Sequence, residues 1–507
     1  MSKVWTESKL GEEARKAIKK GMDAVYSPVS ATMGASGRNA AYLDVGGVTV
    51  TNDGISIARR INPKDDFERL GADLIKQAAE ETNKEAGDGT TTSIVLAHAL
   101  VEAGLKDSRS PMVIRKELEK AKNEVVKRIK SSSKEVKTDK ELLNVAKISV
   151  EDDKLAKIVA DTVKNAGEFG TVIVEEGTGY SIEQDSVNGY FWDRGYFSRY
   201  FSNNEKGESV LEDVSVIVTD RYMNRNLELM GVLNDIHEKG AKSVLIIADK
   251  MEGELLQTLI TNHLQGRLKV CAVVRPPSDE ELEDIASITG ATAITKDKGI
   301  RKITSEHVGV AKKVISTKDR VVLVTDESIP ARQMRVETLR KSLKSEKEDE
   351  LKKDISERLA KLTDGIIVLR VGAKTESERK YLSLKVEDAV NSVLSAKEEG
   401  IVKGGGVALF EISQHIGDPI MKEALKKPFE TILRNAGIEA GKELEENDGY
   451  NVLTGEVVND MFKEGIIDPA KVERCSVENA VSLASTVITL DSVIVRKERL
   501  DEKESDF

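Results

Sequence analysis

The sequence predicts a multidomain α/β protein in which a mostly helical domain, built from both chain ends, carries an inserted α/β domain. At 507 residues the chain is too long for one hydrophobic core, so two or three domains are expected. Apolar residues recur at the helical period near both ends, whereas short β-branched runs occupy the middle. No Pro- or Ser-rich linker marks either transition, which favours insertion over a string of separate domains.

The first third of the chain is predicted to be helical with one short strand. A helix is expected over residues 8–30, where the apolar positions are Ala14, Ile18, Met22, Val25 and Val29. A glycine turn at 34–37 and a strand within 40–50 follow, and then helices over 67–82 and 93–105. Residues 113–165 read as mostly helical.

The middle of the chain predicts strands that alternate with helices. The β-branched runs are Thr171–Val174, Ser243–Ile247, Lys269–Val274 and Val321–Val324. One charged helix is expected from Leu339 to Leu362, with an apolar stripe of Leu343, Leu351, Ile355, Leu359 and Leu362. A strand is expected at 365–372, and a helical pattern returns from Val386 onward. Gly189, Gly372 and Gly400 are candidate hinges, although ordinary turns explain such glycines equally well.

Composition excludes several classes of function. Charged residues make up 33% of the chain and aromatic ones 4%, and the net charge of −11 argues against a nucleic-acid binder. No apolar run approaches the ~20 residues of a membrane span, and the N-terminus lacks the apolar core of a signal peptide. Cys271 and Cys475 lie far apart without metal-ligand spacing, so we expect buried thiols in a reducing cytoplasm and no zinc site.

The segment Gly87–Thr92, with the sequence GDGTTT, is the strongest chemical signal in the chain. Two glycines allow backbone amides to converge on an anion, and the helix that follows adds the free amides and positive end of its dipole. Asp88 within the loop is placed to hold a divalent metal against phosphate oxygens. The sequence GxxxxGK[ST] is absent, so an ordinary P-loop is excluded. A purely structural turn that caps a helix remains an alternative.

Three further glycine turns have weaker signals. They are Thr32-Met33-Gly34, Asn52-Asp53-Gly54 and Gly404-Gly405-Gly406. Each one alone predicts a turn.

The chain resembles the GroEL-type (group I) chaperonins. The resemblance rests on the stretches Gly87–Thr92, Phe191–Tyr196, Val386–Ala389, Glu398–Leu409 and Gly449–Asn451, which follow the family order and spacing from about residue 5 to residue 495. It implies three domains, with an equatorial ATPase domain at 1–134 and 400–507, an intermediate domain at 135–187 and 373–399, and an apical domain at 188–372. The implied function is an ATP-dependent molecular chaperone.

The resemblance also implies the residues of an ATP site. The nucleotide would contact Thr32, Met33, Gly34, Asn52, Asp88, Gly89, Thr90, Thr91, Thr92, Gly405, Asn451 and Asp468. Asp88 would hold Mg²⁺, with K⁺ as a further cofactor. Asp388 would position the attacking water, with Asp53 as a second catalytic carboxylate. Phosphoryl transfer suits such a site, because it needs geometry and charge neutralisation rather than a covalent protein group.

The apical domain would bind non-native proteins through an apolar rim. The candidate residues are Tyr196, Tyr200, Phe201, Met230, Leu233, Leu256 and Ile260. Leu259 is equally well explained as a core residue. The family uses the same groove for a co-chaperonin lid of the GroES type, and its subunits form homo-oligomeric rings, commonly of seven.

The chain departs from the family pattern at several places. Ala35 and Arg199 stand where proline is usual, and Thr261 where an aliphatic residue is usual. The region between Gly437 and Gly449 is shortened, and the C-terminus lacks a Gly-Met tail, so one or two rings remain open.

Several alternatives remain besides the chaperone. A single-ring variant without a separate lid belongs to the same family, and an archaeal-type subunit would need a longer apical protrusion. A small-molecule kinase or ligase could use the same loop, and a scaffold without ATPase activity is disfavoured because Asp53, Asp88 and Asp388 are all present.

Overall fold

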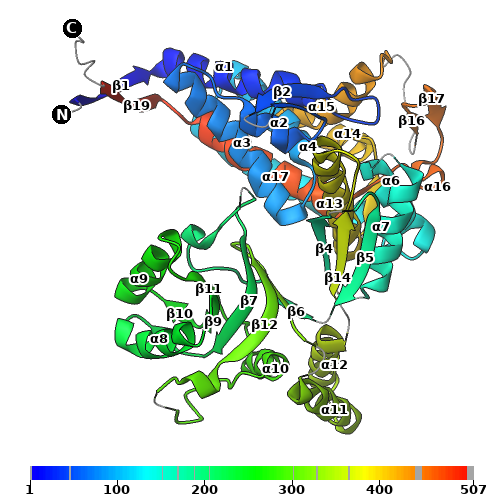
Figure 1. The fold of residues 1–507 in the computed structure, drawn as a ribbon. Helices are drawn as coiled ribbons and strands as arrows, with labels where there is room; N and C mark the ends of the chain where they lie inside the picture. The colour runs from blue at the N-terminus through cyan, green and yellow to red at the C-terminus, as the bar shows by residue number, and fades with distance from the viewer. Residues whose placement is uncertain are drawn as a thin grey trace. The chain divides into compact units, whose positions relative to one another are not determined.

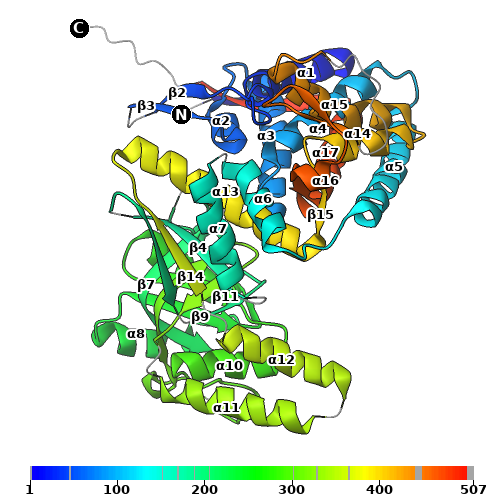
Figure 2. The same cartoon turned by 90° about the vertical axis from the view of Figure 1, so that its right-hand side faces the viewer.

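The computed structural model divides the chain into two compact units, and the predicted insertion is confirmed (Figures 1 and 2). The end unit comprises Met1–Asp161, Glu176–Ser181 and Val371–Phe507, and the inserted unit comprises Thr162–Glu175 and Ile182–Arg370. The structure describes residues 3–44, 47–150, 152–167, 171–177, 179–187, 189–204, 206–300, 302–326, 329–346, 348–363, 366–439 and 448–499. Most of the shortened region before Gly449 and the C-terminal tail lie outside these residues.

Helices dominate the end unit. They are α1 (Gly11–Ser30), α2 (Gly54–Arg60), α3 (Asp66–Ala86), α4 (Thr90–Lys106), α5 (Pro111–Ser132), α6 (Asp139–Val150), most of α7 (Asp153–Asn165), α13 (Glu376–Glu399), α14 (Val407–Gln414), α15 (Pro419–Asn435), α16 (Met461–Glu464) and α17 (Ala470–Ile488). The predicted helices over 8–30, 67–82 and 93–105 are therefore confirmed as α1, α3 and α4.

Short two-stranded sheets complete the end unit. They pair β1 (Lys3–Leu10) with β19 (Ser492–Arg499), β2 (Ala40–Asp44) with β3 (Gly47–Thr51), β15 (Ile401–Lys403) with β18 (Ile467–Pro469), and β16 (Gly449–Asn451) with β17 (Glu456–Val458). Each of these pairs is antiparallel. The β1–β19 pair joins the two ends of the chain, so both termini belong to one hydrophobic core with α1, α3, α4, α5 and α17.

Helices α1 and α3 lie unusually close together in that core. A Cβ atom on Gly21 would stand 1.8 Å from the carbonyl oxygen of Glu68, and one on Gly71 would stand 2.1 Å from that of Ile18. Glycine is therefore required at both positions for backbone-to-backbone contact. The N-terminus of α3 is fixed by Asp65, whose carboxylate accepts from the amides of Phe67 and Glu68.

The inserted unit is built on a six-stranded mixed sheet in the order β11-β9-β7-β12-β13-β6. The strands are β6 (Gly189–Trp192), β7 (Ser209–Val218), β9 (Ser243–Ala248), β11 (Lys269–Val274), β12 (Gly309–Ser316) and β13 (Val321–Val324). Strands β7, β9 and β11 are parallel, whereas β12 pairs antiparallel with β7 and β13. The predicted strands at 243–247, 269–274 and 321–324 are confirmed.

The remaining elements of the inserted unit surround this sheet or form smaller ones. The helices are α8 (Met230–Glu238), α9 (Gly253–Leu264), α10 (Asp279–Thr289), α11 (Pro330–Ser345) and α12 (Asp349–Thr363), and the short 3-10 helices are η1 (Arg199–Phe201), η2 (Asn226–Glu228) and η3 (Ser305–His307). A three-stranded sheet has the order β4 (Thr171–Glu176), β14 (Ile366–Val371) and β5 (Ile182–Val187), and β8 (Tyr222–Met223) pairs with β10 (Lys250–Met251). Within the described residues, no helix has both the length and the hydropathy of a membrane span.

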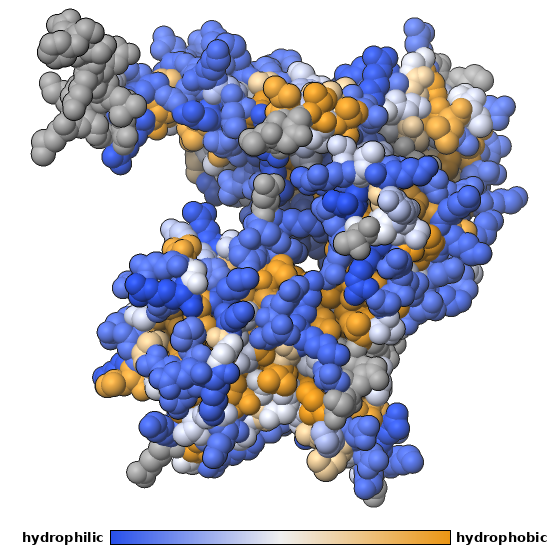
Figure 3. Space-filling view, viewed as in Figure 1, coloured by the Kyte–Doolittle hydropathy of each residue, from blue (hydrophilic) through white to orange (hydrophobic). Residues whose placement is uncertain are grey.

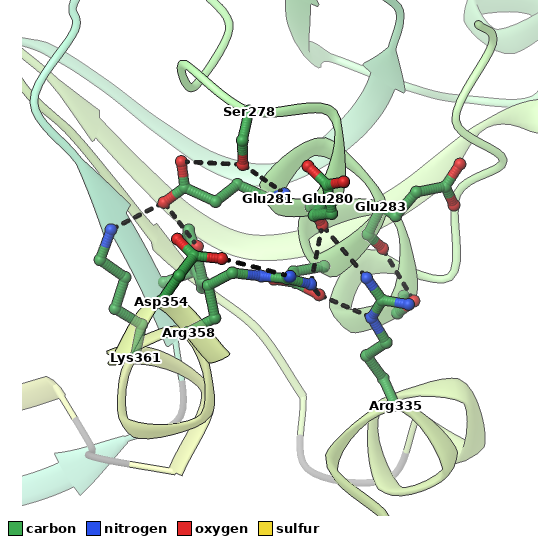
Figure 4. A network of polar contacts seen from close by, with 11 residues as sticks. Ser278, Glu280, Glu281, Glu283, Arg335, Asp354, Arg358 and Lys361 are labelled. Carbon is green, nitrogen blue, oxygen red and sulfur yellow. Dashed lines mark hydrogen bonds and ion pairs between the residues drawn. The ribbon is translucent and has the colours of Figure 1, made fainter. Parts of the chain in front are cut away.

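The prediction of one helix from Leu339 to Leu362 is wrong, because the chain breaks between α11 and α12. The reason is a polar network that needs both helices (Figure 4). Asp284 of α10 is fully buried and accepts from Nε of Arg335 on α11 at 2.6 Å and from Nε of Arg358 on α12 at 2.8 Å. One straight helix could not bring both guanidinium groups to a single carboxylate.

A second buried carboxylate extends the network. Glu281 accepts from Nζ of Lys361 at 2.7 Å and from the hydroxyl of Tyr190 at 3.1 Å. Burial and the charge of Glu281 raise the pKa of Tyr190 well above its ordinary value, so this hydroxyl remains a donor at neutral pH.

We expect Asp284→Ala to destabilise the inserted unit by about 3–5 kcal/mol, because it leaves the buried guanidinium of Arg358 and the partly buried one of Arg335 without their shared anion. Urea unfolding followed by the fluorescence of Trp192, which is buried in this unit, measures the loss in a Trp5→Phe background. Asp354→Ala is the control, since Asp354 is 59% exposed and 3.9 Å from Arg358. Equal effects of the two substitutions would contradict the network's role.

Candidate functional site

A cavity of about 730 Å³ lies within the end unit and gathers all the residues predicted for the nucleotide site. Its lining includes Thr32, Met33, Gly34, Asn52, Asp53, Asp88, Gly89, Thr90, Thr91, Thr92, Asp388, Gly405, Asn451 and Asp468. These residues come from several segments that lie far apart in the sequence, and the fold brings them to one place.

The GDGTTT loop joins the end of α3 to the start of α4. Gly87 caps α3 at φ 69° and Gly89 caps α4 at φ 85°, both in the left-handed region that favours glycine. No side chain caps the start of α4, so the amides of its first turn face the cavity without a helical partner. This arrangement can bind an anion such as a phosphate group.

Asp88 is fixed by two hydrogen bonds at the cavity wall. Its Oδ1 accepts from the amide of Gly89 at 2.5 Å, and its Oδ2 accepts from the hydroxyl of Ser392 on α13. Desolvation raises the pKa of this carboxyl above its ordinary value, so a nearby positive charge would favour its ionised form.

These surroundings fit a magnesium ion held by one carboxylate. Each oxygen of Asp88 accepts a single hydrogen bond and keeps capacity for a further partner. Within the described part of the chain, no three His, Cys, Asp or Glu side chains form a preformed metal cage. Mg²⁺ typically takes one or two carboxylates, waters and phosphate oxygens rather than such a cage.

Asp388 and Asp53 bring two more carboxylates to the same cavity. Asp53 caps α2 and accepts from the amides of Ile55 at 3.2 Å and Ser56 at 3.1 Å. Asp388 lies on α13, and desolvation together with the charges of Asp53 and Asp88 raises its pKa well above the ordinary value. A carboxyl with a raised pKa is a stronger base when it is ionised, which suits a group that accepts a proton from water.

The glycine run and Asp468 form another part of the wall. Strands β15 and β18 pair Val402 with Asp468, and Oδ2 of Asp468 accepts from the amide of Gly405 at 3.0 Å. Desolvation and the charge of Asp88 raise the pKa of Asp468. The carboxylate is thus oriented by the backbone and faces the cavity.

The remaining predicted residues lie in turns held by asparagine side chains. Nδ2 of Asn435 donates to the carbonyl oxygens of Ser30 and Met33, both at 2.9 Å, and fixes the turn that contains Thr32 and Gly34. Oδ1 of Asn451 accepts from the amide of Leu453 at 3.1 Å. Both turns therefore keep their shape without a ligand.

Sequence reasoning missed several polar residues of the cavity, among them Lys385, Ser392 and Glu473. Ser392 follows Asp388 by one helical turn, and that spacing was a usable signal. Glu473 of α17 had no such signal, since α17 reads as an ordinary helix. Its side chain is 5% exposed, and its Oε2 has no hydrogen-bond partner within the described residues. Desolvation and the charges of Asp468 and Asp88 raise its pKa.

The residues predicted for an apolar rim divide into surface and core. Tyr200 is 54% exposed, whereas Tyr196, Met230, Leu256 and Ile260 are half-buried against the core of the inserted unit. Phe201 and Leu233 are buried within that core and offer no surface. Leu259 is likewise buried, in agreement with its interpretation as a core residue.

Comparison with known proteins agrees with the resemblance to chaperonins. Residues 25–498 match the family model described as the TCP-1/cpn60 chaperonin family. Among solved structures, the chaperonin gp146 from the bacteriophage EL 2 (Pseudomonas aeruginosa), crystallised in the presence of ATP-BeFx, is similar at 23% identity and a TM-score of 0.71 in one crystal form. A second crystal form gives a TM-score of 0.64, and each match covers 96% of this chain and 99% of the other. These structural matches concern the fold.

Glu473→Gln is expected to stabilise the nucleotide-free protein at alkaline pH. The folded-state pKa of Glu473 is raised above 4.5, so the folded state retains a proton that the unfolded state releases, and stability falls as pH rises through this interval. In urea unfolding at pH 9, the free energy of unfolding of the variant should exceed that of the unsubstituted protein by about 1–3 kcal/mol. At pH 5 this difference should be smaller. Glu478→Gln, on the same helix but paired with Arg474, is the control. No difference in pH dependence between Glu473→Gln and the unsubstituted protein would contradict this prediction.

Proposed function

The chain belongs to the TCP-1/cpn60 chaperonin family, and from this premise we propose how its two units carry out the work of an ATP-dependent molecular chaperone. The subunits form a homo-oligomeric ring, a surface of the inserted unit captures non-native proteins, and ATP hydrolysis in the end unit times their release. The observation that carries the proposal is the single cavity in which all the predicted nucleotide residues meet. That these residues meet in one cavity of one unit supports an ATP site there.

The proposed roles in the ATP site follow from the groups that face the cavity. The amides at the start of α4 and the hydroxyls of Thr90, Thr91 and Thr92 bind phosphate oxygens. Asp468 and the turns at Thr32–Gly34 and Asn451 hold the nucleoside, with Asn52 and Gly405 beside them. Mg²⁺ bound at Asp88 would neutralise phosphate charge, and K⁺ is proposed as a second cation.

Asp388 is the proposed acceptor of the proton of the attacking water. Its carboxyl lies on α13 and lines the same cavity as the GDGTTT loop. Asp53 is held by two amides of α2 and raises the pKa of Asp388 through its charge. Hydrolysis then depends on geometry and charge rather than on a covalent intermediate.

The proposed capture surface lies on η1, η2, α8 and α9, which contact one another in the inserted unit. Tyr200 and Leu227 are 54% and 95% exposed there, and Leu264 at the end of α9 is also exposed. Half-buried Tyr196, Met230, Leu256 and Ile260 extend the apolar area. On the face seen in Figure 3, apolar residues of this unit gather in patches between hydrophilic ones, as expected of a surface that binds unfolded chains without reading their sequence.

The proposed division of labour uses three functional parts. Residues 1–134 and 400–507 form the equatorial ATPase, 188–372 the apical capture domain, and 135–187 with 373–399 the intermediate part that carries Asp388. A GroES-type lid, a seven-membered ring and one or two stacked rings are proposed for the assembly. The free and buried thiols of Cys271 and Cys475 support a reducing, cytoplasmic location.

Asp388→Ala should lower the rate of ATP hydrolysis by about 10²-fold or more while nucleotide affinity changes little, because proton transfer is lost and binding groups remain. Single-turnover hydrolysis and equilibrium binding of ATP measure the two effects. Asp153→Ala is the matched control, since Asp153 lines the same cavity but its side chain is 84% exposed. Unchanged hydrolysis in Asp388→Ala would remove this residue from the mechanism.

Tyr200→Glu should weaken capture of a denatured protein by about 10-fold, because a charge in the apolar surface must be desolvated against an apolar segment, while basal ATP hydrolysis stays within about 2-fold. Co-sedimentation of denatured test protein with the assembled chain measures capture. Tyr180→Glu is the control, because Tyr180 is also exposed, at 81%, but belongs to the end unit. Retained capture in Tyr200→Glu would place the surface elsewhere. Electron microscopy of the same preparations reports ring size and number.

A further inference from the structure

Helix α13 contacts three consecutive residues, Ala86–Asp88, where α3 ends and the GDGTTT loop begins. The hydroxyl of Ser392 donates to Oδ2 of Asp88, and the hydroxyl of Ser395 donates to the carbonyl oxygen of Ala86 at 2.9 Å. The side chain of Asn391 covers Gly87 so closely that a Cβ atom on Gly87 would stand 2.3 Å from that of Asn391. The segment from Ala86 to Asp88 therefore lies directly against α13.

Ser392 and Asp388 lie one helical turn apart and both line the cavity. The position of one therefore determines the position of the other. A hydrogen bond from Ser392 to Asp88 consequently fixes the distance between the carboxyl of Asp388 and the loop. Of the three contacts, this is the one made to a side chain that faces the cavity.

The hydrogen bond also fixes the orientation of Asp88. Its Oδ1 is bound by the neighbouring amide of Gly89, and its Oδ2 has Ser392 as the partner that the structure describes. In a Ser392→Ala variant, the carboxylate of Asp88 would keep its hydrogen bond from the amide of Gly89 and could rotate about χ2. A hydrogen bond to an ionised carboxylate is stronger than one between neutral groups.

We propose that Ser392 is a positioning residue. It orients the carboxylate of Asp88 and fixes the position of α13, and with it the position of the Asp388 carboxyl in the cavity. This inference rests on the proposed function, in which Asp88 holds Mg²⁺ and Asp388 accepts a proton from water. Groups that orient a metal-binding carboxylate commonly change metal affinity by about 10–100-fold when they are removed. The hydroxyl of Ser392 is thus expected to act on Mg²⁺ binding and on hydrolysis together.

The test compares Ser392→Ala with Ser395→Ala in the full-length protein. Both serines are buried on α13, both bond to the same loop segment, and both variants remove one hydroxyl. Only Ser392 bonds to the carboxylate of Asp88. Thermal unfolding of the two variants shows whether each is folded, and calorimetric binding of a non-hydrolysable ATP analogue at a series of Mg²⁺ concentrations provides a readout that does not depend on turnover.

The expected result is specific to Ser392. Ser392→Ala should need about 10-fold more Mg²⁺ for half-maximal binding of the analogue, and its kcat for ATP should fall about 10-fold at saturating Mg²⁺ while KM changes little. Ser395→Ala should show the Mg²⁺ dependence of the unsubstituted protein. A Ser392→Ala variant with unchanged Mg²⁺ dependence, or equal shifts in the two variants, would overturn the inference.

The same measurements separate this inference from the proposed function. If Asp388→Ala abolishes hydrolysis while Ser392→Ala changes neither Mg²⁺ dependence nor kcat, only the positioning role fails. If Asp388→Ala leaves hydrolysis intact, the proposed mechanism fails whatever Ser392→Ala does.

Discussion

The close packing of two helices against the GDGTTT loop is the constraint on which the rest of the site depends. A Cβ atom on Gly87 would stand 2.3 Å from that of Asn391 on α13, and one on Gly89 would stand 2.6 Å from Cγ1 of Val472 on α17. Both glycines also have positive φ angles. Any side chain at either position would push a helix away and carry Asp388 or Glu473 with it. The glycines of the loop therefore determine where the two helices that line the cavity can lie.

This packing concentrates negative charge in a poorly hydrated space. Asp88, Asp388, Asp468 and Glu473 all have raised pKa values, and desolvation is the first cause for each. A carboxyl whose pKa is raised in the folded state opposes folding as the pH rises through that pKa. Lys385 at the same cavity partly offsets this effect at Asp88 and Asp388. A ligand that brings its own cations relieves this repulsion and stabilises the end unit by mass action. Nucleotide binding and the stability of the unit are thus linked by the same charges.

Local signals in the sequence predicted much of the fold and the site, and tertiary constraints account for the failures. The loop at 87–92 and the strands at 243–247 and 269–274 were predictable because their glycines and β-branched runs act over a few residues. The break between α11 and α12 was not, since it depends on Asp284, far away in the sequence. Leu233 was predicted to be exposed and Glu473 was missed for the same reason. Helical periodicity does not show which neighbouring element covers a given face of a helix.

Helix α13 carries the first residues of the cavity that follow the inserted unit in the chain. The chain leaves the inserted unit at Arg370, and α13 begins at Glu376, so residues 371–375 alone separate the two. The residues of that helix that line the cavity or contact the segment Ala86–Asp88 are Tyr381, Leu384, Lys385, Asp388, Asn391, Ser392 and Ser395. The inserted unit is therefore linked by this short covalent path to the helix that carries Asp388, the residue proposed to accept a proton from water. The helix also buries an apolar face that includes Val386, Val390 and Val393, so any displacement of α13 would expose part of the core of the end unit. Apolar packing and hydrogen bonds therefore hold Asp388 in place together.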